Sequence, residues 1–458
     1  MRIRSVATSI QLASVAFVGI LAGCASPPVD QVDLMPAPEV YGNGLLNPLP
    51  ETNPFDRIPY DGILFVTDRA PATSEDPEQY YRNDRGQVLR LGLAEIQFGK
   101  KEFQWEFARQ VSMLKSRTTE FPVKISKVDE WGIMGRSVPY WFDMNLMRED
   151  ETLPDVEDKF AEAINAQLAA SKKKHVYIYV HGYKVVYENP VLVSAELWHF
   201  LGYDGVFIAY AWPSTPSKFA YIKDSDTSEG YARNLRLLIE FIAEKTDAEA
   251  INVIGYSNGS RLVTRAMEQL ALIHHEETAD EIFEQLHLRN VILLGSDLDR
   301  GVFGSFLADG LLNVSRHLSI YVSQHDKALG FSQFLTRRGR LGQLWGGKSG
   351  AIHPLARQAL INYRDQISFI NVTEAEGANT GNGHGYFRSS PWASSDVLMS
   401  MYYNLTPEQR GLVEQEDLPI FTFPPDYISR LWDAIKAVDP GFAENLKVFR
   451  AKQTTGSN

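Results

Sequence analysis

The pentapeptide Gly255–Gly259, with Ser257 at its centre, constrains the fold of this chain more than any other feature. An apolar run from Ile251 to Ile254 precedes it, which predicts a buried strand. In a strand–turn–helix unit, Gly-x-Ser-x-Gly forms a nucleophile elbow, whose strained turn lifts the serine hydroxyl above a sheet edge. The two glycines let the strand and the helix approach closely. The apolar residues that predict the helix recur every three or four positions and are Leu262, Val263, Ala266, Met267, Leu270 and Ala271.

Strands and helices are predicted to alternate on both sides of this unit. Most of the strands are continuous apolar runs, which indicates burial on both faces and hence a largely parallel sheet with helices on both sides, an α/β fold. Apart from one strand, residues 103–150 give no clear pattern. The predicted strands are 62–67, 88–99, 121–128, 175–180, 205–211, 251–254, 290–294, 317–322 and 367–372. The predicted helices are 157–171, 189–201, 231–245, the one after the elbow, and 427–438.

The N-terminus has the pattern of a secretory signal. Two arginines precede an apolar segment over residues 6–21, and small residues follow it. The sequence Leu21-Ala22-Gly23-Cys24 resembles the bacterial lipoprotein signal, in which the cysteine is lipidated and begins the mature chain. We therefore expect residues 1–23 to be a signal peptide and Cys24 to carry a lipid. Cys24 is the only cysteine, so no intramolecular disulfide can form in the exported protein.

The predicted destination is the outer membrane, facing the periplasm. Ser26 stands two residues after the cysteine, where the inner-membrane retention signal would have Asp. Residues 24–60 hold eight prolines, which favour an extended tether between the lipid and the folded part. The expected division is therefore a tether at 24–60, an α/β-hydrolase domain at 61–400 and a C-terminal helical extension at 401–458.

Composition excludes one class of partner. The formal net charge is −12, and no basic stripe offsets it, which argues against nucleic-acid binding. No spacing of His, Cys, Asp and Glu is typical of a metal site. The sequence therefore predicts no metal and no cofactor. The expected partners are a small-molecule or lipid ester and the membrane.

Polar residues follow the ends of several predicted strands, and these residues are the candidates for chemistry. In a doubly wound sheet, ligands bind outside the carboxyl ends of the strands. A serine, an acid and a histidine in that chain order are typical of an α/β-hydrolase triad. The candidates are, in chain order, His181, Ser257, Asp297, Asp299, Asp326 and His384.

Each member of a Ser-Asp-His triad has a distinct task. Serine needs a neutral imidazole to accept its proton, and the imidazole needs a carboxylate that fixes its tautomer. His384 lies in a glycine-rich loop that can place its ring over the sheet edge, so it is the predicted base. Asp326 is the predicted acid. Asp297 and Asp299 remain alternatives, and Asp299 also suits the start of a helix.

The oxyanion hole is predicted to use two backbone N–H groups, those of Asn258 and Tyr183. His181 is predicted to brace its loop rather than to act as a base. Trp212 and Tyr256 are the candidate substrate-binding residues. For Trp212, as for Tyr221 and Tyr231, a place in the core is an equal alternative to a pocket wall.

Several blocks of the chain resemble a bacterial α/β-hydrolase family filed as a domain of unknown function, number 900 in that series. The resemblance spans about residues 63–397 and implies an esterase-type serine hydrolase with Ser257, Asp326 and His384 as its triad. It implies no substrate. Tyr256 and Asn258 depart from the His and Met that commonly flank the serine. The blocks are His181–Tyr183, Trp212–Ser214, Gly255–Gly259, Ser296–Arg300, Ser323–Ala328 and Gly383–Phe387.

The sequence thus predicts a lipid-anchored serine hydrolase of the bacterial envelope that cleaves esters through an acyl-enzyme. Two alternatives stay open. One is an amidase or peptidase. The other is a non-catalytic lipoprotein that binds envelope partners, which predicts that His384 lies too far from Ser257 for a hydrogen bond.

Overall fold

The computed structural model describes residues 31–439 and Gly441, except residues 45, 74–79, 100–103, 119, 148–155, 337, 344–353 and 416–417. The predicted signal peptide and Cys24 lie outside the described residues. None of the helices in the described part is long and apolar enough to cross a membrane.

Within the described residues, twelve strands form one sheet in the order β1-β4-β3-β2-β6-β5-β7-β8-β9-β10-β12-β11. The strands from β2 to β12 in that order are mutually parallel. Antiparallel strands extend both edges. The bounds are β1 Gln31–Asp33, β2 Ile63–Pro71, β3 Tyr81–Phe98, β4 Pro122–Ile133, β5 His175–Val180, β6 Val206–Ala211, β7 Ala250–Tyr256, β8 Leu288–Leu294, β9 His317–Val322, β10 Ile367–Asn371, β11 Val413–Gln415 and β12 Leu418–Thr422.

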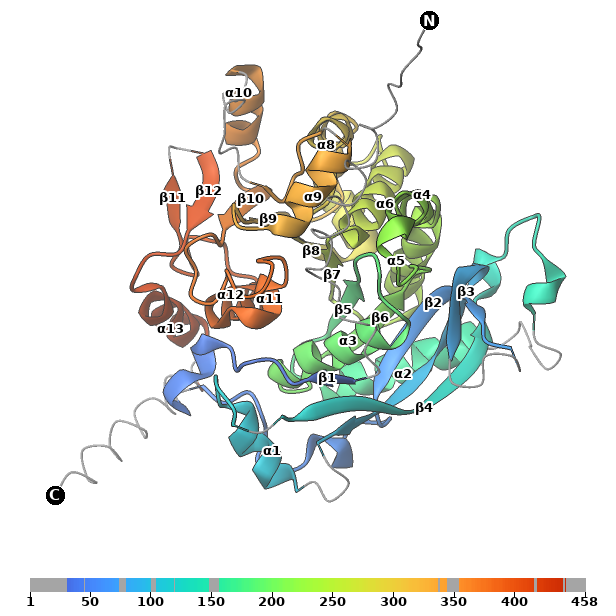
Figure 1. The fold of residues 1–458 in the computed structure, drawn as a ribbon, viewed down its shortest axis with the longest axis horizontal. Helices are drawn as coiled ribbons and strands as arrows, with labels where there is room; N and C mark the ends of the chain where they lie inside the picture. The colour runs from blue at the N-terminus through green and yellow to red at the C-terminus, as the bar shows by residue number, and fades with distance from the viewer. Residues whose placement is uncertain are drawn as a thin grey trace, which may run out of the picture.

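Helices cover both faces of this sheet (Figure 1). Alternate residues of β5 enter opposite cores, because Ile178 packs with one apolar cluster and Tyr177 with the other. The α/β-hydrolase architecture predicted from the sequence is confirmed. The α-helices are α1 Trp105–Ser112, α2 Val156–Ala170, α3 Glu188–Phe200, α4 Tyr221–Gly230, α5 Ala232–Lys245, α6 Gly259–Ile273, α7 Ala279–Leu286, α8 Arg300–Ala308, α9 Lys327–Thr336, α10 Pro354–Asn362, α11 Tyr386–Ser389, α12 Pro391–Tyr403 and α13 Tyr427–Val438.

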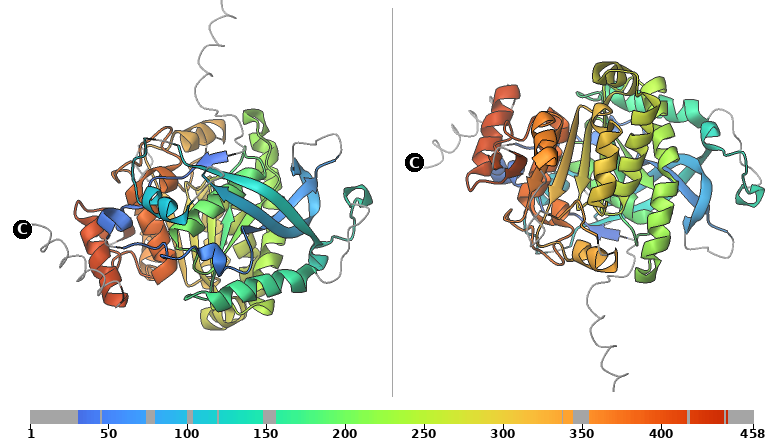
Figure 2. Two further views of the ribbon diagram at one scale, coloured as in Figure 1. Left: turned by 90° about the horizontal axis from the view of Figure 1, so that it is seen from below. Right: turned by 90° about the horizontal axis from the view of Figure 1, so that it is seen from above.

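The N-terminal segment from residue 31 to 60 is part of the folded body, so the predicted tether is wrong for these residues. β1 pairs with β4, and the short 3-10 helix η1, Glu39–Gly44, packs beside α13 (Figure 2). The Trp432 indole donates to the carbonyl of Val40 at 2.7 Å. Val40 is fully buried. The prolines bend this segment around the domain instead of keeping it extended in solvent.

A buried carboxylate fixes the same segment to the helices beneath it. Glu196 of α3 accepts a hydrogen bond from the Met35 N–H at 2.7 Å and from the Arg388 guanidinium at 2.8 Å. Burial raises the pKa of Glu196, although the positive charge of Arg388 opposes the rise. Both carboxylate oxygens of Glu196 accept hydrogen bonds, and these bonds favour its charged form.

The predicted C-terminal helical extension is helical only in part among the described residues, because β11 and β12 precede α13 and extend the sheet. β12 pairs in parallel with β10. Asp396 of α12 is buried and accepts hydrogen bonds from Arg410 at 2.7 Å and from Tyr427 at 2.8 Å. The sequence predicts only α13 there, because Pro419 interrupts the short apolar run of β12 and counts against a strand.

Among the described residues, His175, His181 and His199 are three of the buried imidazoles. Burial lowers the pKa of His199 to about 3 and that of His175 to about 4, and it lowers the pKa of His181 well below its usual range. His199 is held by Tyr203 at 2.6 Å and Ser112 at 2.7 Å. The unfolded-state value is about 6.5, so below that pH the unfolded chain binds protons that the folded chain does not. These residues therefore destabilise the fold as pH drops from about 6.5 toward 4.

We expect His199→Gln to flatten the pH dependence of stability. One proton of linkage changes the free energy of unfolding by about 1.4 kcal/mol per pH unit, so the variant should lose about 2 kcal/mol less than wild type between pH 6.5 and 5. Urea titrations at pH 7, 6 and 5 measure this. His275→Gln, at the exposed end of α6, is the matched control and should leave the slope unchanged. Burial raises the pKa of Asp68 to about 7, so this carboxyl stabilises the fold as pH falls. Its contribution is the same in the wild type and the variant, so it cancels when their pH dependences are compared.

Candidate active site

Ser257 sits in a strained turn between β7 and α6. Its φ is +52°, in the left-handed region that residues other than glycine rarely adopt. Backbone hydrogen bonds hold it there, because the Ser257 N–H donates to Leu294 at 2.9 Å and its carbonyl accepts from Asp297 at 3.2 Å. The bonds tie the turn to β8 and to the loop after it. Such strain persists where the surrounding structure over-determines it, and it is typical of functional sites.

Two glycines allow the chain to close around this serine. A Cβ on Gly259 would lie 2.3 Å from the carbonyl oxygen of His181, so only glycine lets α6 begin so near the end of β5. A Cβ on Gly182 would lie 2.9 Å from Ser257 Cβ and 3.4 Å from its Oγ. The loop after β5 therefore passes directly beside the serine side chain.

His384 and Asp326 form a buried pair. The distance from His384 Nδ1 to Asp326 Oδ2 is 2.6 Å, and the two residues are 8% and 2% exposed. An ionised carboxylate can only accept, so we assign the proton to Nδ1, which leaves Nε2 as an acceptor. The other carboxylate oxygen accepts from the Leu329 N–H at 3.0 Å. The pair is thus oriented from both sides.

Gly295 fills the space beside this pair. A Cβ there would lie 3.0 Å from His384 Cε1 and 3.3 Å from Asp326 Oδ2, and Gly295 has a φ of +53°. It directly follows Leu294, whose carbonyl binds the N–H of Ser257. The ring of Tyr256, the residue before the serine, lies 5.0 Å from the His384 ring. Serine and histidine are therefore neighbours at one edge of the sheet.

The hydroxyl of Ser257 and the ring of His384 are not hydrogen-bonded to each other in the part of the chain that the structure describes. Ser257 is 5% exposed, so both side chains are nearly enclosed. Catalytic hydrogen bonds are often long or poorly aligned without substrate and tighten only in the complex. The missing bond is compatible with a triad at rest, and it is also what the non-catalytic alternative predicts.

The other two candidate acids are occupied elsewhere. Asp299 caps α8, accepting from the N–H groups of Gly301 at 2.9 Å and Val302 at 3.1 Å. Asp297 accepts from the Tyr221 hydroxyl at 2.7 Å and forms an ion pair with Arg340 at 3.3 Å. Of the three carboxylates, Asp326 is the one that the structure brings to His384.

Two backbone N–H groups beside Ser257 are free. Within the described residues, neither the Asn258 N–H nor the Tyr183 N–H has a hydrogen-bond acceptor. Asn258 directs its side-chain amide away, to Ser225 at 2.9 Å. Free donors next to a serine hydroxyl suit an oxygen that gains negative charge during reaction.

A family described as "Alpha/beta hydrolase of unknown function (DUF900)" matches residues 156–400, more than half of the chain. The chain belongs to this family. It is also similar to the crystal structure of a lipase-esterase related protein from Clostridium acetobutylicum. That match has 12% identity and a TM-score of 0.27, and covers 50% of this chain and 95% of the other. No curated protein matches the sequence.

Trp212 of this α/β hydrolase is a core residue, so its prediction as a substrate-binding residue is wrong. Its side chain is fully buried and stacks on His181 with ring centroids 5.0 Å apart and an interplanar angle of 6°. Its indole N–H donates to the His181 carbonyl at 2.6 Å. His181 braces the loop that carries Tyr183, as expected. The other predicted substrate-binding residue, Tyr256, is half-buried beside His384.

Tyr386 is a supporting residue of the hydrolase site that sequence reasoning missed. Its hydroxyl accepts from the Gly295 N–H at 2.6 Å and donates to the Tyr321 carbonyl at 3.0 Å. It therefore ties the ends of β8 and β9 together beneath the histidine. The only signal was its position two residues after His384, which does not indicate a role.

Gly182→Ala is expected to impair the site without unfolding the hydrolase. The new methyl would displace Ser257 or the Tyr183 N–H by several tenths of an ångström, and losing one oxyanion donor typically costs about 100-fold in turnover. Hydrolysis of p-nitrophenyl acetate and thermal melting measure the two effects. Gly304→Ala on α8, where a Cβ meets nothing within 4 Å, is the matched control and should be active. Full activity of Gly182→Ala would show that the loop containing Gly182 does not contribute to the active site.

Proposed function

We propose that this protein is a serine hydrolase that cleaves carboxylic esters through an acyl-enzyme intermediate. The observation that carries the proposal is the 2.6 Å pair of Asp326 and His384 beside the strained Ser257. The family match supports a hydrolase in general. The triad and the ester specificity are our inference from the arrangement of these side chains.

In the proposed first step, Ser257 Oγ attacks the ester carbonyl while His384 Nε2 takes its proton. Asp326 stabilises the imidazolium that forms. The carbonyl oxygen becomes an oxyanion and accepts from the N–H groups of Asn258 and Tyr183. When the tetrahedral intermediate collapses, the C–O bond breaks, and His384 gives the proton to the departing alkoxide. An alcohol leaves, and the acyl group stays on Ser257.

In the second step, a water molecule replaces the alcohol. His384 takes a proton from this water as it attacks the acyl carbon, and the oxyanion again accepts hydrogen bonds from the same two N–H groups. Collapse releases the carboxylic acid, and the proton returns to Ser257 Oγ. The overall reaction consumes one ester and one water and yields one acid and one alcohol. Esters are the first class to test because an alkoxide leaves more readily than an amine.

The test is active-site labelling followed by substrate comparison. A fluorophosphonate probe should label the wild-type protein but not Ser257→Ala, and it should label His384→Ala at least about 100-fold more slowly, since general-base catalysis contributes that much. Matched p-nitrophenyl esters and anilides then separate an esterase from an amidase or peptidase. Equal labelling of wild type and Ser257→Ala would refute the serine mechanism.

A second candidate function is binding without turnover. The absence of a hydrogen bond between Ser257 and His384 among the described residues favours it. This candidate predicts that neither probe labelling nor ester hydrolysis depends on His384. The labelling experiment therefore decides between the two candidates.

We also propose that the chain is exported and anchored to the outer membrane through a lipid on Cys24. The support is the sequence Leu21–Cys24 after a positively charged start. Cys24→Ala should move the protein from the membrane fraction to the soluble fraction. Membrane association unchanged by this substitution would contradict the anchor.

A further inference from the structure

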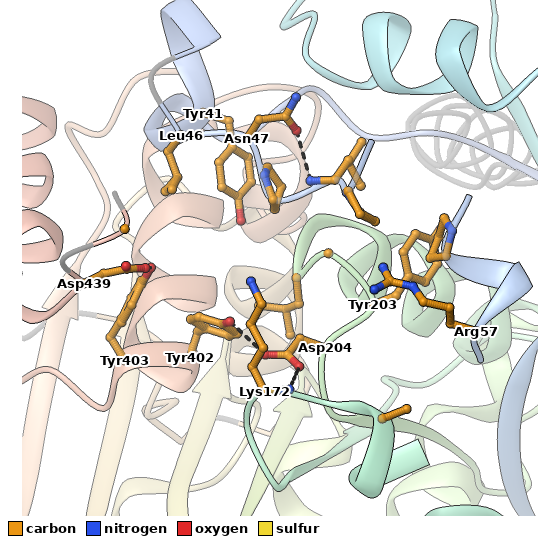
Figure 3. A pocket seen from close by; sticks show the side chains of 18 of the residues that line it. Tyr41, Leu46, Asn47, Arg57, Lys172, Tyr203, Asp204, Tyr402, Tyr403 and Asp439 are labelled. Carbon is orange, nitrogen blue, oxygen red and sulfur yellow. Dashed lines mark hydrogen bonds between the residues drawn. The ribbon is translucent and has the colours of Figure 1, made fainter. Parts of the chain in front are cut away.

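A cavity of about 470 Å³ lies at the edge of the sheet opposite Ser257 (Figure 3). It reaches Asp204, two residues before β6 begins, whereas Ser257 follows the other end of β7. A six-residue strand spans about 20 Å, so the cavity and the serine are separated by the length of a strand. The volume is within the range of small-molecule sites.

The cavity is built in part by segments of the chain that the family match does not include. Its walls include residues of the N-terminal segment, such as Tyr41 and Arg57, and residues after α12, such as Asp439. The match spans 156–400. The two segments meet over the ends of α2 and α3, so the cavity exists because both are folded onto the domain.

One side of the cavity offers hydrogen-bond acceptors. Asp204 accepts from the Lys172 N–H at 2.6 Å and from the Tyr402 hydroxyl at 2.8 Å, which leaves part of its capacity free. Gln167 is 2% exposed, and its Oε1 has no partner among the described residues. Its amide nitrogen donates to the Gly205 carbonyl at 3.2 Å, which fixes the orientation.

The cavity also offers donors. Lys172 and Arg57 line the cavity, and the described residues contain no ion-pair partner for either side chain. Figure 3 shows both charged ends directed into the open space. Asp439, on the far wall, accepts from the Tyr403 hydroxyl at 2.9 Å. The lining therefore presents positive and negative groups around one space.

Tyrosine rings stand between these groups. Tyr203, Tyr402 and Tyr403 line the cavity, and the rings of Tyr402 and Tyr403 pack edge to face with centroids 4.9 Å apart. Such rings present flat apolar surfaces beside polar tips. The lining of the cavity thus combines apolar ring faces with side chains that only donate hydrogen bonds and side chains that only accept them.

We propose that this cavity binds a saccharide of one or two rings. Sugar hydroxyls both donate and accept, so one sugar can donate to Asp204 and accept from Lys172 and Arg57. The C–H faces of a sugar ring pack on tyrosine rings. A simple anion would face Asp204 and Asp439, and a simple cation would face the two basic side chains. An acyl chain would leave all of these polar groups without partners.

The test is isothermal titration of D-glucose, N-acetylglucosamine, D-glucuronic acid, maltose and cellobiose into the Ser257→Ala protein. Using this variant separates binding from any ester chemistry, so the result does not depend on the proposed hydrolase function. At least one sugar should bind saturably. Lys172→Gln and Arg57→Gln should each weaken it about tenfold, because each removes a charged donor. Both side chains are exposed, so the fold should tolerate the changes, which thermal melting checks.

Lys174→Gln is the matched control, since Lys174 is exposed two residues beyond Lys172 and does not line the cavity. It should leave sugar binding unchanged. Three results would overturn the proposal: no binding by any sugar of the panel, sugar binding that Lys172→Gln and Arg57→Gln do not weaken, and tighter binding of glycylglycine or inorganic phosphate than of every sugar. The second of these would place the sugar elsewhere, and the third would assign the cavity to a zwitterion or an anion.

Discussion

Replacing Ser257 by alanine is expected to reduce ester hydrolysis by at least about 10⁴-fold, because the covalent step then has no nucleophile. The residual rate would come from the free N–H groups of Asn258 and Tyr183, which can still polarise a bound carbonyl. The measurement is kcat/KM on p-nitrophenyl esters of increasing acyl length. The folded state should persist, since alanine can retain the backbone hydrogen bonds that hold the elbow.

A positive φ strains alanine as it strains serine, so thermal melting of Ser257→Ala is measured beside activity. The matched control is Ser305→Ala, an exposed serine on α8 whose hydroxyl bonds only to the Gly301 carbonyl among the described residues. It should retain full activity. Turnover by Ser257→Ala at the wild-type rate would show that the nucleophile is elsewhere.

Asp326→Asn is expected to lower kcat by about 10⁴-fold while leaving the fold intact. The asparagine amide can donate to His384 Nδ1, which moves the imidazole proton to Nε2 and removes the acceptor that Ser257 needs. The loss should therefore appear in kcat more than in KM. The side chains are nearly equal in size, so thermal melting should change little.

The alternative acids supply the controls for this experiment. Asp299→Asn should keep both activity and the cap of α8, since asparagine is also a good N-cap residue. Asp297→Asn should weaken the ion pair with Arg340 and lower stability before it lowers kcat. Inactivation by Asp297→Asn with full activity in Asp326→Asn would reverse our assignment.

The central strands and the elbow could be predicted because their signals are local. The run from Ile251 to Ile254 and the helical spacing after Gly259 hold regardless of the rest of the chain. The N-terminal segment could not be predicted in this way. Its partner for Val40 is Trp432, 392 residues away, and eight prolines suggested an extended conformation. Only long-range packing distinguishes a wrapped segment from a free one.

Sequence reasoning reached the site residues but could not rank them. Asp297, Asp299 and Asp326 all follow strands of one sheet, and their roles depend on which loop turns toward His384. The sequence left open whether Trp212 faces a pocket or the core, because the answer depends on its stacking on His181 in the folded structure. The cavity around Asp204 could not be foreseen at all, since its walls come from both ends of the chain.

The place where β1 begins limits how far the described structure can lie from the proposed lipid anchor on Cys24. The first described strand, β1, begins at Gln31, seven residues after Cys24, and a chain covers at most about 3.6 Å per residue. A lipid on Cys24 would hold β1 within about 25 Å of the bilayer. The enzyme would then search for substrate in a thin layer along the membrane. An inserted flexible linker after Cys24 should widen that layer and alter the turnover of membrane-bound esters but not of dissolved ones.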